Sequence, residues 1–233
     1  AMINGLGQYL HEAADDSDVK VIVIRAEGEK AFTAGFDLKE SMEHNITDIV
    51  ERRADTKSEV DFFLYMWYLP KPIISAVQGY CIGGGITIAM MSDLVIAADN
   101  ASFGNPEIVL GFTPEIPMEH WKLPFNKATE WYFMGKYFSA EEMREMGMVN
   151  EVVPYGNLEE RVMQVARIPA ESMAMMKHTI RKIYDLRGFA NTVEYTSEMF
   201  NLSRTNMQQK NMQSFKSDIE SGGLKSALNT RYN

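Results

Sequence analysis

Three consecutive glycines, Gly83 to Gly85, interrupt an otherwise apolar part of the chain that begins at Lys71. A glycine inside a helix or strand destabilises that element by roughly 0.5–1 kcal/mol relative to alanine, so three together are not expected within one. Residues 73–77 before them are typical of a buried strand, and residues 86–93 after them are typical of a helix. The glycines therefore predict a strand-to-helix turn with an accessible backbone.

The sequence around this turn repeats the alternation of strand and helix. Residues 19–28 predict a first strand, residues 30–40 a turn-rich loop, and residues 45–68 a helix that is ended by the sequence LPKP. Residues 94–99 predict another strand, directly after the helix of 86–93. Strands that alternate with helices in this order indicate a layered α/β fold with parallel strands.

The second half of the chain has a mainly helical pattern. Ser139, with Glu142 three residues later, is a capping box that predicts the start of a helix. The predicted elements are helices over 127–135 and 139–147, a strand over 148–154, and mostly helix from 157 to 230 with a break at 221–223.

The composition limits the classes of partner. The 233 residues are 45% hydrophobic and 24% charged, which favours one large globular domain. A net charge of −9 argues against a nucleic-acid-binding surface, which needs a basic face. No apolar run approaches the roughly 20 residues that span a bilayer, and the start of the chain has no signal-peptide pattern. Cys81 is the single cysteine, so we expect no intrachain disulfide and a reducing, cytoplasmic location.

The glycine turn also has a chemical interpretation. Backbone N–H groups in the first turn of a helix have no partner within the helix, and the helix dipole places partial positive charge there. A second loop of little bulk, at Ala34 and Gly35, follows the first predicted strand. Two N–H groups from two such loops can stabilise a developing oxyanion. Loops at the carboxyl ends of parallel strands are also where open α/β sheets bind ligands.

Four motifs together resemble the crotonase family, the enoyl-CoA hydratase/isomerase superfamily, over about residues 19–185. They are AFTAGFDL, KPIISAVQGYCIGGG, MMSDLVIAADNASFGNPEIVLG and GMVNEVVP, in that order. The resemblance implies a repeated ββα core over residues 1–185 and a helical region over 186–233 that packs against neighbouring subunits in a homotrimer or a dimer of trimers. It implies acyl-CoA thioester substrates of fatty acid metabolism, an enolate intermediate, and neither a metal nor a cofactor beyond the coenzyme A of the substrate.

By motif position, the resemblance assigns the oxyanion donors to the N–H groups of Phe36 and Gly84, and the acid/base group to Glu107 in NPEI. It also implies that a further set of residues contacts the acyl-CoA, with the two cations of the set near the phosphates. These residues are Ala34, Asp37, Leu38, Gly83, Thr87, Arg25 and Lys39.

The acids depart from the familiar pattern. Thr87 stands where two-glutamate hydratases of the family have their first glutamate, and a threonine does not take a proton from water at neutral pH. Glu115, eight residues after Glu107, is placed where some isomerases of the family have an acid. Two carboxyl groups in different environments can divide the acid and base roles. His120 is a further acid/base candidate by type, whereas Asp93 is interpreted as structural.

Hydration of an enoyl-CoA with Glu107 as the acid/base is the leading prediction. Three alternatives stay open: isomerisation of an enoyl- or dienoyl-CoA by Glu107 and Glu115, hydrolytic C–C cleavage of a cyclic β-keto acyl-CoA, and a non-catalytic acyl-CoA-binding protein. Six apolar residues are candidates for the acyl pocket, although aromatic residues at helical spacing more often form the core. They are Phe62, Phe63, Met66, Trp67, Phe112 and Trp121.

Overall fold

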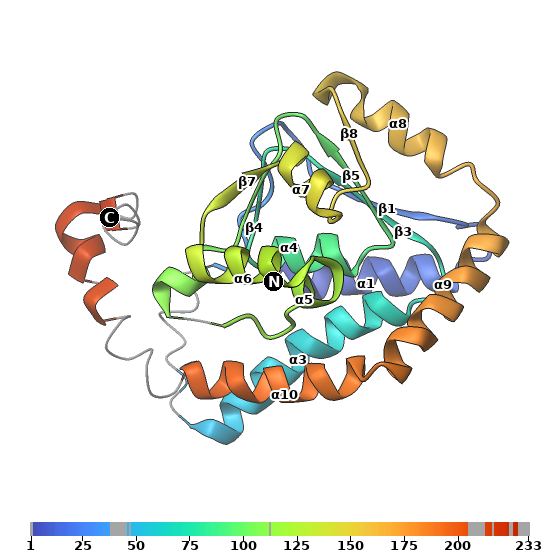
Figure 1. Ribbon diagram of the computed structural model, residues 1–233. Coiled ribbons are helices and arrows are strands. Elements are labelled where there is room, and N and C mark those ends of the chain that lie inside the picture. The colour runs from blue at the N-terminus through green and yellow to red at the C-terminus, as the bar shows by residue number, and fades with distance from the viewer. Residues whose placement is uncertain are drawn as a thin grey trace.

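The computed structural model describes residues 2–37, 46, 48–111, 113–204, 213–215, 217–223 and 226–227. Two four-stranded sheets lie at its centre, with helices around them (Figure 1). Three of the predicted site residues or pocket candidates, Leu38, Lys39 and Phe112, lie outside the described residues.

The first sheet has the strand order β1-β3-β5-β8, and all neighbouring strands are parallel. Its strands are β1 (Ile22–Arg25), β3 (Ile73–Val77), β5 (Leu94–Ala98) and β8 (Glu151–Val153). Every residue of β3 is buried, because helices cover both faces of this sheet. The predicted strands at 73–77 and 94–99 are thereby confirmed, and those at 19–28 and 148–154 are confirmed in shortened form.

The second sheet has the order β2-β4-β6-β7, in which the first three strands are parallel and β7 is antiparallel to β6. Its strands are β2 (Ala31–Thr33), β4 (Tyr80–Ile82), β6 (Ser102–Gly104) and β7 (Tyr137–Ser139). Each of the first three strands of the first sheet is followed along the chain by a three-residue strand of the second sheet, which gives the repeated ββα pattern that the resemblance implies. The sequence pattern does not predict this second sheet.

Gly79 makes the passage from β3 to β4 possible. Its φ is +58°, in the left-handed region that favours glycine, and a Cβ there would collide with the backbone of Lys30. The chain can therefore bend between the two sheets only with glycine at this position.

The helices cover the sheets and one another. They are α1 (Met2–Asp15), α3 (Ile49–Tyr68), α4 (Gly84–Met91), α5 (Glu119–Lys122), α6 (Phe125–Met134), α7 (Ala140–Met146), α8 (Leu158–Val165), α9 (Ala170–Leu186) and α10 (Phe189–Leu202), with short 3₁₀ turns η1 (Pro106–Leu110) and η2 (Tyr155–Asn157). α3 packs against α10, α4 and α1, and it runs beside α10 in Figure 1.

Local signals determine several helix ends. The side chain of Asp48 accepts hydrogen bonds from the N–H groups of Val50 and Glu51 and so caps α3. The capping box of Ser139 and Glu142 is present at the start of α7, as predicted. Residues 217–223 form a helical turn whose last residue, Gly223, has φ +78°, so the chain leaves the helical conformation within the predicted break at 221–223.

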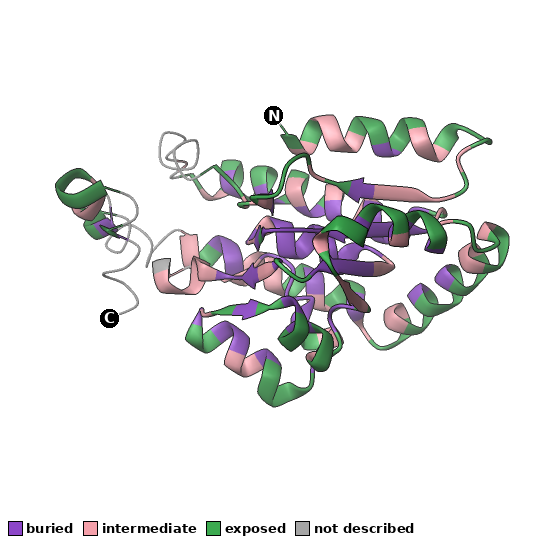
Figure 2. Cartoon of the chain, turned by 90° about the horizontal axis from the view of Figure 1, so that it is seen from above, coloured by how far each residue is buried: buried purple, intermediate pink, exposed green. Residues whose placement is uncertain are grey.

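The core is divided by the first sheet. Alternate residues of its strands face opposite sides, so Ile73 and Val77 join the main cluster with α3 and α4, whereas Ile74 and Ala76 face α8. Figure 2 shows buried residues concentrated in the strands and exposed residues along the outer sides of the helices.

Candidate active site

Three loops meet at one edge of the second sheet. Strands β2, β4 and β6 are parallel neighbours, so their carboxyl ends lie at the same edge. The segments that follow them begin at Ala34, Gly83 and Asn105. The fold thus brings together the loop of Phe36, the glycine turn and the segment that contains Glu107. The two loops predicted to supply the oxyanion donors therefore follow short strands of the second sheet. The sequence pattern predicts them directly after the longer strands that form the first sheet.

Each glycine of the turn has a close neighbour that a side chain would displace. A Cβ on Gly83 would collide with Oε1 of Glu107, and one on Gly84 would lie 2.9 Å from Cε2 of Phe36. A Cβ on Gly85 would collide with the side chain of Thr33. The three glycines are therefore required by close packing between the three loops.

The backbone of the two predicted donors is available. α4 begins at Gly84, with Gly83 before it at φ +55°. Within the described residues, neither the N–H of Gly84 nor that of Phe36 donates a hydrogen bond. A Cβ on Gly35, whose φ is +86°, would lie 3.6 Å from the nitrogen of Gly84, so the two loops touch. This geometry is suited to holding an oxyanion between two N–H donors.

Glu107 lies directly beside the glycine turn. It is the second residue of η1, and its carboxyl contacts Gly83 through Oε1. Its other oxygen, Oε2, is buried without a hydrogen-bond partner in the described part of the chain. The pKa of Glu107 is raised to about 8, by burial first and by the charges of Glu115 and Glu119, against a lowering by its own backbone N–H. Glu107 therefore holds a proton at neutral pH.

Glu115 and Glu119 complete a group of three buried carboxyls. Glu115 is 6% exposed, its Oε1 has no partner among the described residues, and burial raises its pKa while Arg204 lowers it. Burial raises the pKa of Glu119 to about 7, although this group accepts a hydrogen bond from the hydroxyl of Tyr132. The charge of Glu115 contributes to the raised pKa values of both other carboxyls, so the three groups are coupled.

The remaining predicted contact residues are partly gathered at the same edge. Ala34 and Asp37 are exposed in the loop after β2, and Thr87 is buried in the first turn of α4. Arg25 instead forms an exposed ion pair with Glu159 of α8, 2.9 Å apart. Its described contacts include none with the other site residues, so a role at the phosphates stays a prediction.

Several further candidates belong to the packing of the fold. Phe63, Met66 and Trp67 are fully buried in the main core, which favours the core interpretation. Trp121 packs against Tyr184 and Phe189, with ring centroids 5.6 Å away in both cases. His120 is exposed, and its ring lies 5.0 Å from that of Tyr132, outside the loops around Gly83.

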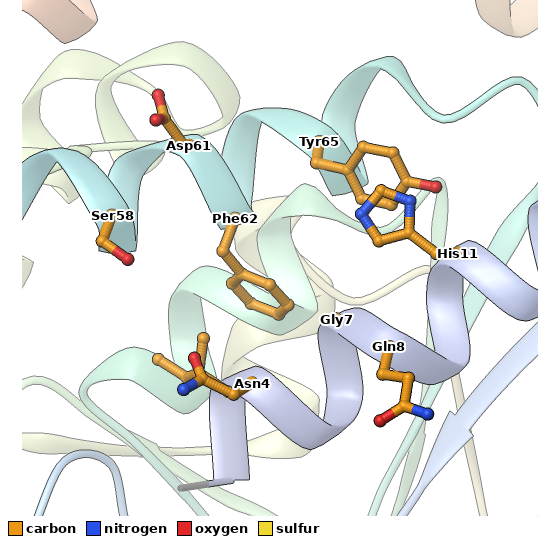
Figure 3. A pocket seen from close by; sticks show the side chains of 9 residues that line it. Asn4, Gly7, Gln8, His11, Ser58, Asp61, Phe62 and Tyr65 are labelled. Carbon is orange, nitrogen blue, oxygen red and sulfur yellow. The ribbon is translucent and has the colours of Figure 1, made fainter.

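A separate groove of about 470 Å³ lies between α1 and α3 (Figure 3). Phe62 points into it from α3, and His11 of α1 stacks on Tyr65 with centroids 3.9 Å apart. Polar residues of both helices line the rest, including Gln8 and Asp61. None of the predicted catalytic residues is in this groove, so Phe62 lines a different surface from the one predicted for it.

Glu119 and Glu59 are not singled out by the sequence. Glu59 of α3 is half-buried, and its pKa is raised to about 8 by burial first and by the charge of Glu115 second. A glutamate among other charged residues of a helix is usually exposed, so the pattern carries no signal for it. Glu119 lies in the unusual segment PEIPMEHW, which is the one available indication.

Metal binding and membrane insertion each require a specific arrangement of residues. In the described ranges, no group of three or more His, Cys, Asp or Glu residues is arranged to hold a metal ion. Likewise, no helix in these ranges has the length and apolar character to cross a bilayer.

Comparison with known proteins places these features in context. Residues 1–220 match the model of the family described as enoyl-CoA hydratase/isomerase. A carnitinyl-CoA dehydratase from Salmonella heidelberg (strain SL476) is 32% identical over 185 residues, which cover 77% of this chain and 68% of the relative.

Solved structures agree with this match. An enoyl-CoA hydratase/isomerase from Xanthobacter autotrophicus Py2 superimposes with a TM-score of 0.90 at 26% identity, over 99% of this chain and 87% of the other. An enoyl-CoA hydratase from Bacillus anthracis gives a TM-score of 0.72 at 26% identity, over 92% and 85% of the two chains.

Proposed function

Because the chain belongs to the enoyl-CoA hydratase/isomerase family, we propose that it adds water to the double bond of an enoyl-CoA, with Glu107 as the acid that protonates the α-carbon. The observation that carries the proposal is the position of the Glu107 carboxyl. It contacts Gly83, one residue before Gly84, whose N–H donates no hydrogen bond within the described residues, and its environment keeps it protonated at neutral pH. An acid there can reach a carbon next to a carbonyl bound at Gly84.

The proposed reaction uses two carboxyls in different states. The carboxylate of Glu115 takes a proton from water as the water oxygen bonds to the β-carbon. The electrons of the double bond move toward the thioester, and its oxygen carries the enolate charge between the N–H groups of Phe36 and Gly84. Glu107 then donates its proton to the α-carbon. Transfer of a proton from Glu115 back to Glu107 restores the starting state.

The dehydratase name of one relative supports water chemistry at such a site, since removal of water is the reverse of its addition. An acyl-CoA thioester as the general class of substrate follows from the family.

Double-bond isomerisation is the second candidate. It is favoured by Thr87, which replaces the carboxyl that two-glutamate hydratases use with water, and by the coupling between Glu107 and Glu115. Two such groups can move a proton between two carbons with no water added. Product mass in isotopically labelled water separates the two reactions, because hydration adds one labelled water and isomerisation adds none.

Glu107→Gln tests the assignment of the acid. The amide cannot donate a proton of comparable acidity, so kcat should fall about 10²–10⁴-fold, while KM for the enoyl-CoA changes little. Steady-state rates with a panel of short enoyl-CoAs measure both constants.

Glu51→Gln is the matched control, because Glu51 is exposed in the first turn of α3. Its rate should equal that of the unchanged protein. Full activity of Glu107→Gln with every enoyl-CoA that the unchanged protein converts would exclude Glu107 as the acid.

A further inference from the structure

The side chain of Phe36 lies against the glycine that carries the other oxyanion donor. A Cβ on Gly84 would have three ring atoms of Phe36 as its nearest neighbours, Cε2 at 2.9 Å, Cδ2 at 3.3 Å and Cζ at 3.5 Å. Because glycine has no side chain, the ring packs directly on the backbone of Gly84. Phe36 therefore belongs to the site twice, once through its backbone N–H and once through its ring.

Packing, and not hydrogen bonding, holds the loop of Phe36 to the glycine turn. The pairing of β2 with β4 ends at Thr33, after a shift of register. In the part of the chain that the structure describes, no backbone hydrogen bond joins residues 34–36 to residues 83–85. The N–H of Gly35 donates instead to the hydroxyl of Thr33 at 3.2 Å. The separation of loop and turn thus depends on side chains that fill the space between them.

The ring of Phe36 contributes little to the core of the protein. It is 36% exposed, and it belongs to neither of the two buried apolar clusters among the described residues. A side chain of this kind adds little to the stability of a fold, since most of the stabilisation comes from full burial. Its removal should therefore leave the protein folded, and its place against Gly84 suggests a role in the site.

The two oxyanion donors need an accurate separation. Both N–H groups must lie about 2.7–3.1 Å from the oxygen that becomes negatively charged. The donor of Phe36 belongs to the loop after β2, whereas the donor of Gly84 begins α4, so nothing in one element alone fixes the distance between them. The two elements already touch, because a Cβ on Gly35 would lie 3.6 Å from the nitrogen of Gly84. A ring wedged at this contact determines how closely they approach.

We propose that the side chain of Phe36 is a positioning residue of the oxyanion site, and that its ring, packed on Gly84, sets the separation between the N–H groups of Phe36 and Gly84. The inference rests on the oxyanion site of the proposed function and adds a side chain to a site that is otherwise made of backbone. The ring acts through the two donors, so its loss should weaken binding of the enolate more than binding of the substrate.

Phe36→Ala removes the ring and keeps the N–H of residue 36. We expect kcat to fall about 10–10²-fold through misplacement of the donors, while KM changes less than about threefold. Phe36→Leu restores most of the apolar volume at Gly84 and should recover at least about half of the loss in log kcat. Phe62→Ala is the matched control, because Phe62 is half-buried and lines the groove between α1 and α3. Its kcat should equal that of the unchanged protein, and an unchanged kcat in Phe36→Ala would overturn the inference.

A double-mutant cycle tests the contact itself. Gly84 has no positive φ, so its backbone accepts alanine, but the added methyl group would lie 2.9 Å from the ring of Phe36 and should displace it. Gly84→Ala alone should therefore lower kcat about tenfold or more. In the double variant with Phe36→Ala the methyl group meets no ring, so kcat should exceed the value expected from two independent effects at least about tenfold. Two effects that simply multiply would contradict the contact.

The stretching frequency of the bound thioester carbonyl reports the donors directly. Hydrogen bonds to a carbonyl oxygen weaken its double bond and lower this frequency, and a loss of stability elsewhere in the fold does not change it. A saturated acyl-CoA is bound at saturating concentration with ¹²C or ¹³C at the carbonyl, and the difference between the two infrared spectra isolates the band. The frequency should be lower than in buffer for the unchanged protein and for Phe62→Ala, and it should return toward the buffer value in Phe36→Ala.

This measurement separates the inference from the proposed function, because a saturated acyl-CoA is not converted. A shift that is present in the unchanged protein and reduced in Phe36→Ala supports the positioning role even if no enoyl-CoA is hydrated, in which case only the proposed hydration fails. An equal shift in both proteins overturns the positioning role and leaves the hydration intact. The absence of a shift in the unchanged protein overturns both, because the two N–H groups then do not bind the thioester oxygen.

Discussion

Glu107 has the same side chain as many exposed glutamates of this chain and differs from them in its surroundings. Its carboxyl lies against a glycine where no side chain separates it from the backbone, and its pKa is raised to about 8 by burial and by two neighbouring carboxyls. A carboxyl in that state is a proton donor at neutral pH, whereas an ordinary glutamate is only an acceptor. The environment therefore determines the role of the residue.

The pH dependence of the two reaction directions follows from this pKa. Hydration needs protonated Glu107, so its kcat/KM should fall as the pH rises through about 8. Removal of water from the hydrated product passes through the same singly protonated pair of Glu107 and Glu115, and the reaction takes up no net proton, so its kcat/KM should fall through the same pH. Initial rates in both directions between pH 6 and 10 measure the two profiles, and Glu107→Gln should abolish both of these limbs. A hydration rate that increases through pH 8 would contradict the acid role.

The turn between β4 and α4 shows how one element can serve both fold and chemistry. The first turn of α4 presents the N–H of Gly84, which has no acceptor in the part of the chain that the structure describes, and the preceding residue, Gly83, has φ +55° and ψ −122°. Side chains are excluded from all three glycine positions by Glu107, Phe36 and Thr33. The conformational free energy that the glycines cost is therefore offset by contacts among the three loops. Larger side chains in the turn would force these loops apart.

Gly83→Ala should damage catalysis and stability together. Its Cβ would collide with the Glu107 carboxyl, and its positive φ is strained for alanine, so we expect the free energy of unfolding to fall by about 1–3 kcal/mol. Displacement of Glu107 should lower kcat about 10²-fold or more. Denaturant titration and steady-state kinetics measure the two effects.

Gly5→Ala is the control for that substitution. Gly5 lies within α1, and a Cβ there has no neighbour within 4 Å. It should leave kcat unchanged and stabilise the protein by up to about 1 kcal/mol. Wild-type kcat in Gly83→Ala would show that the Glu107 carboxyl does not depend on the glycine turn.

A buried ionic network joins the helical part of the chain to the first sheet. Asp93, directly before β5, accepts hydrogen bonds from Lys177 and Arg181 of α9, at 2.8 and 2.7 Å, and from the N–H of Ile73 at 2.8 Å. The guanidinium of Arg181 also lies 3.3 Å from the centre of the Trp67 ring. These contacts agree with the structural interpretation of Asp93.

Asp93→Asn should destabilise the protein without a direct effect on the chemistry. Removing the carboxylate leaves two buried cations uncompensated, so the free energy of unfolding should fall by about 3–5 kcal/mol. Denaturant titration measures the loss, and kcat of the folded fraction should stay close to that of the unchanged protein. Asp61→Asn, which removes an exposed pair with Lys57, should cost less than about 1 kcal/mol. Equal losses in both variants would contradict a special role for the Asp93 network.

Local chemistry was sufficient to predict the strands β3 and β5, the capping box of α7 and the turn at Gly83, because apolar runs, caps and glycines act over a few neighbouring residues. The family motifs likewise indicated Phe36, Gly84 and Glu107. Strands β2, β4, β6 and β7 have three residues each, which is too short for a periodic pattern to be recognised. Their existence depends on pairing between segments that are far apart in the sequence.

Only the tertiary structure decided which charged residues are buried. Glu59 and Glu119 belong to helices, where a glutamate by itself indicates an exposed position, and only the unusual segment PEIPMEHW around Glu119 departs from that expectation. Packing of α3 against α10 and of α5 against α6 half-buries Glu59 and buries Glu119, and the charge of Glu115 contributes to the raised pKa values of both. Burial is a property of the assembled molecule, so the states of these carboxyls could not be predicted from the order of the residues alone.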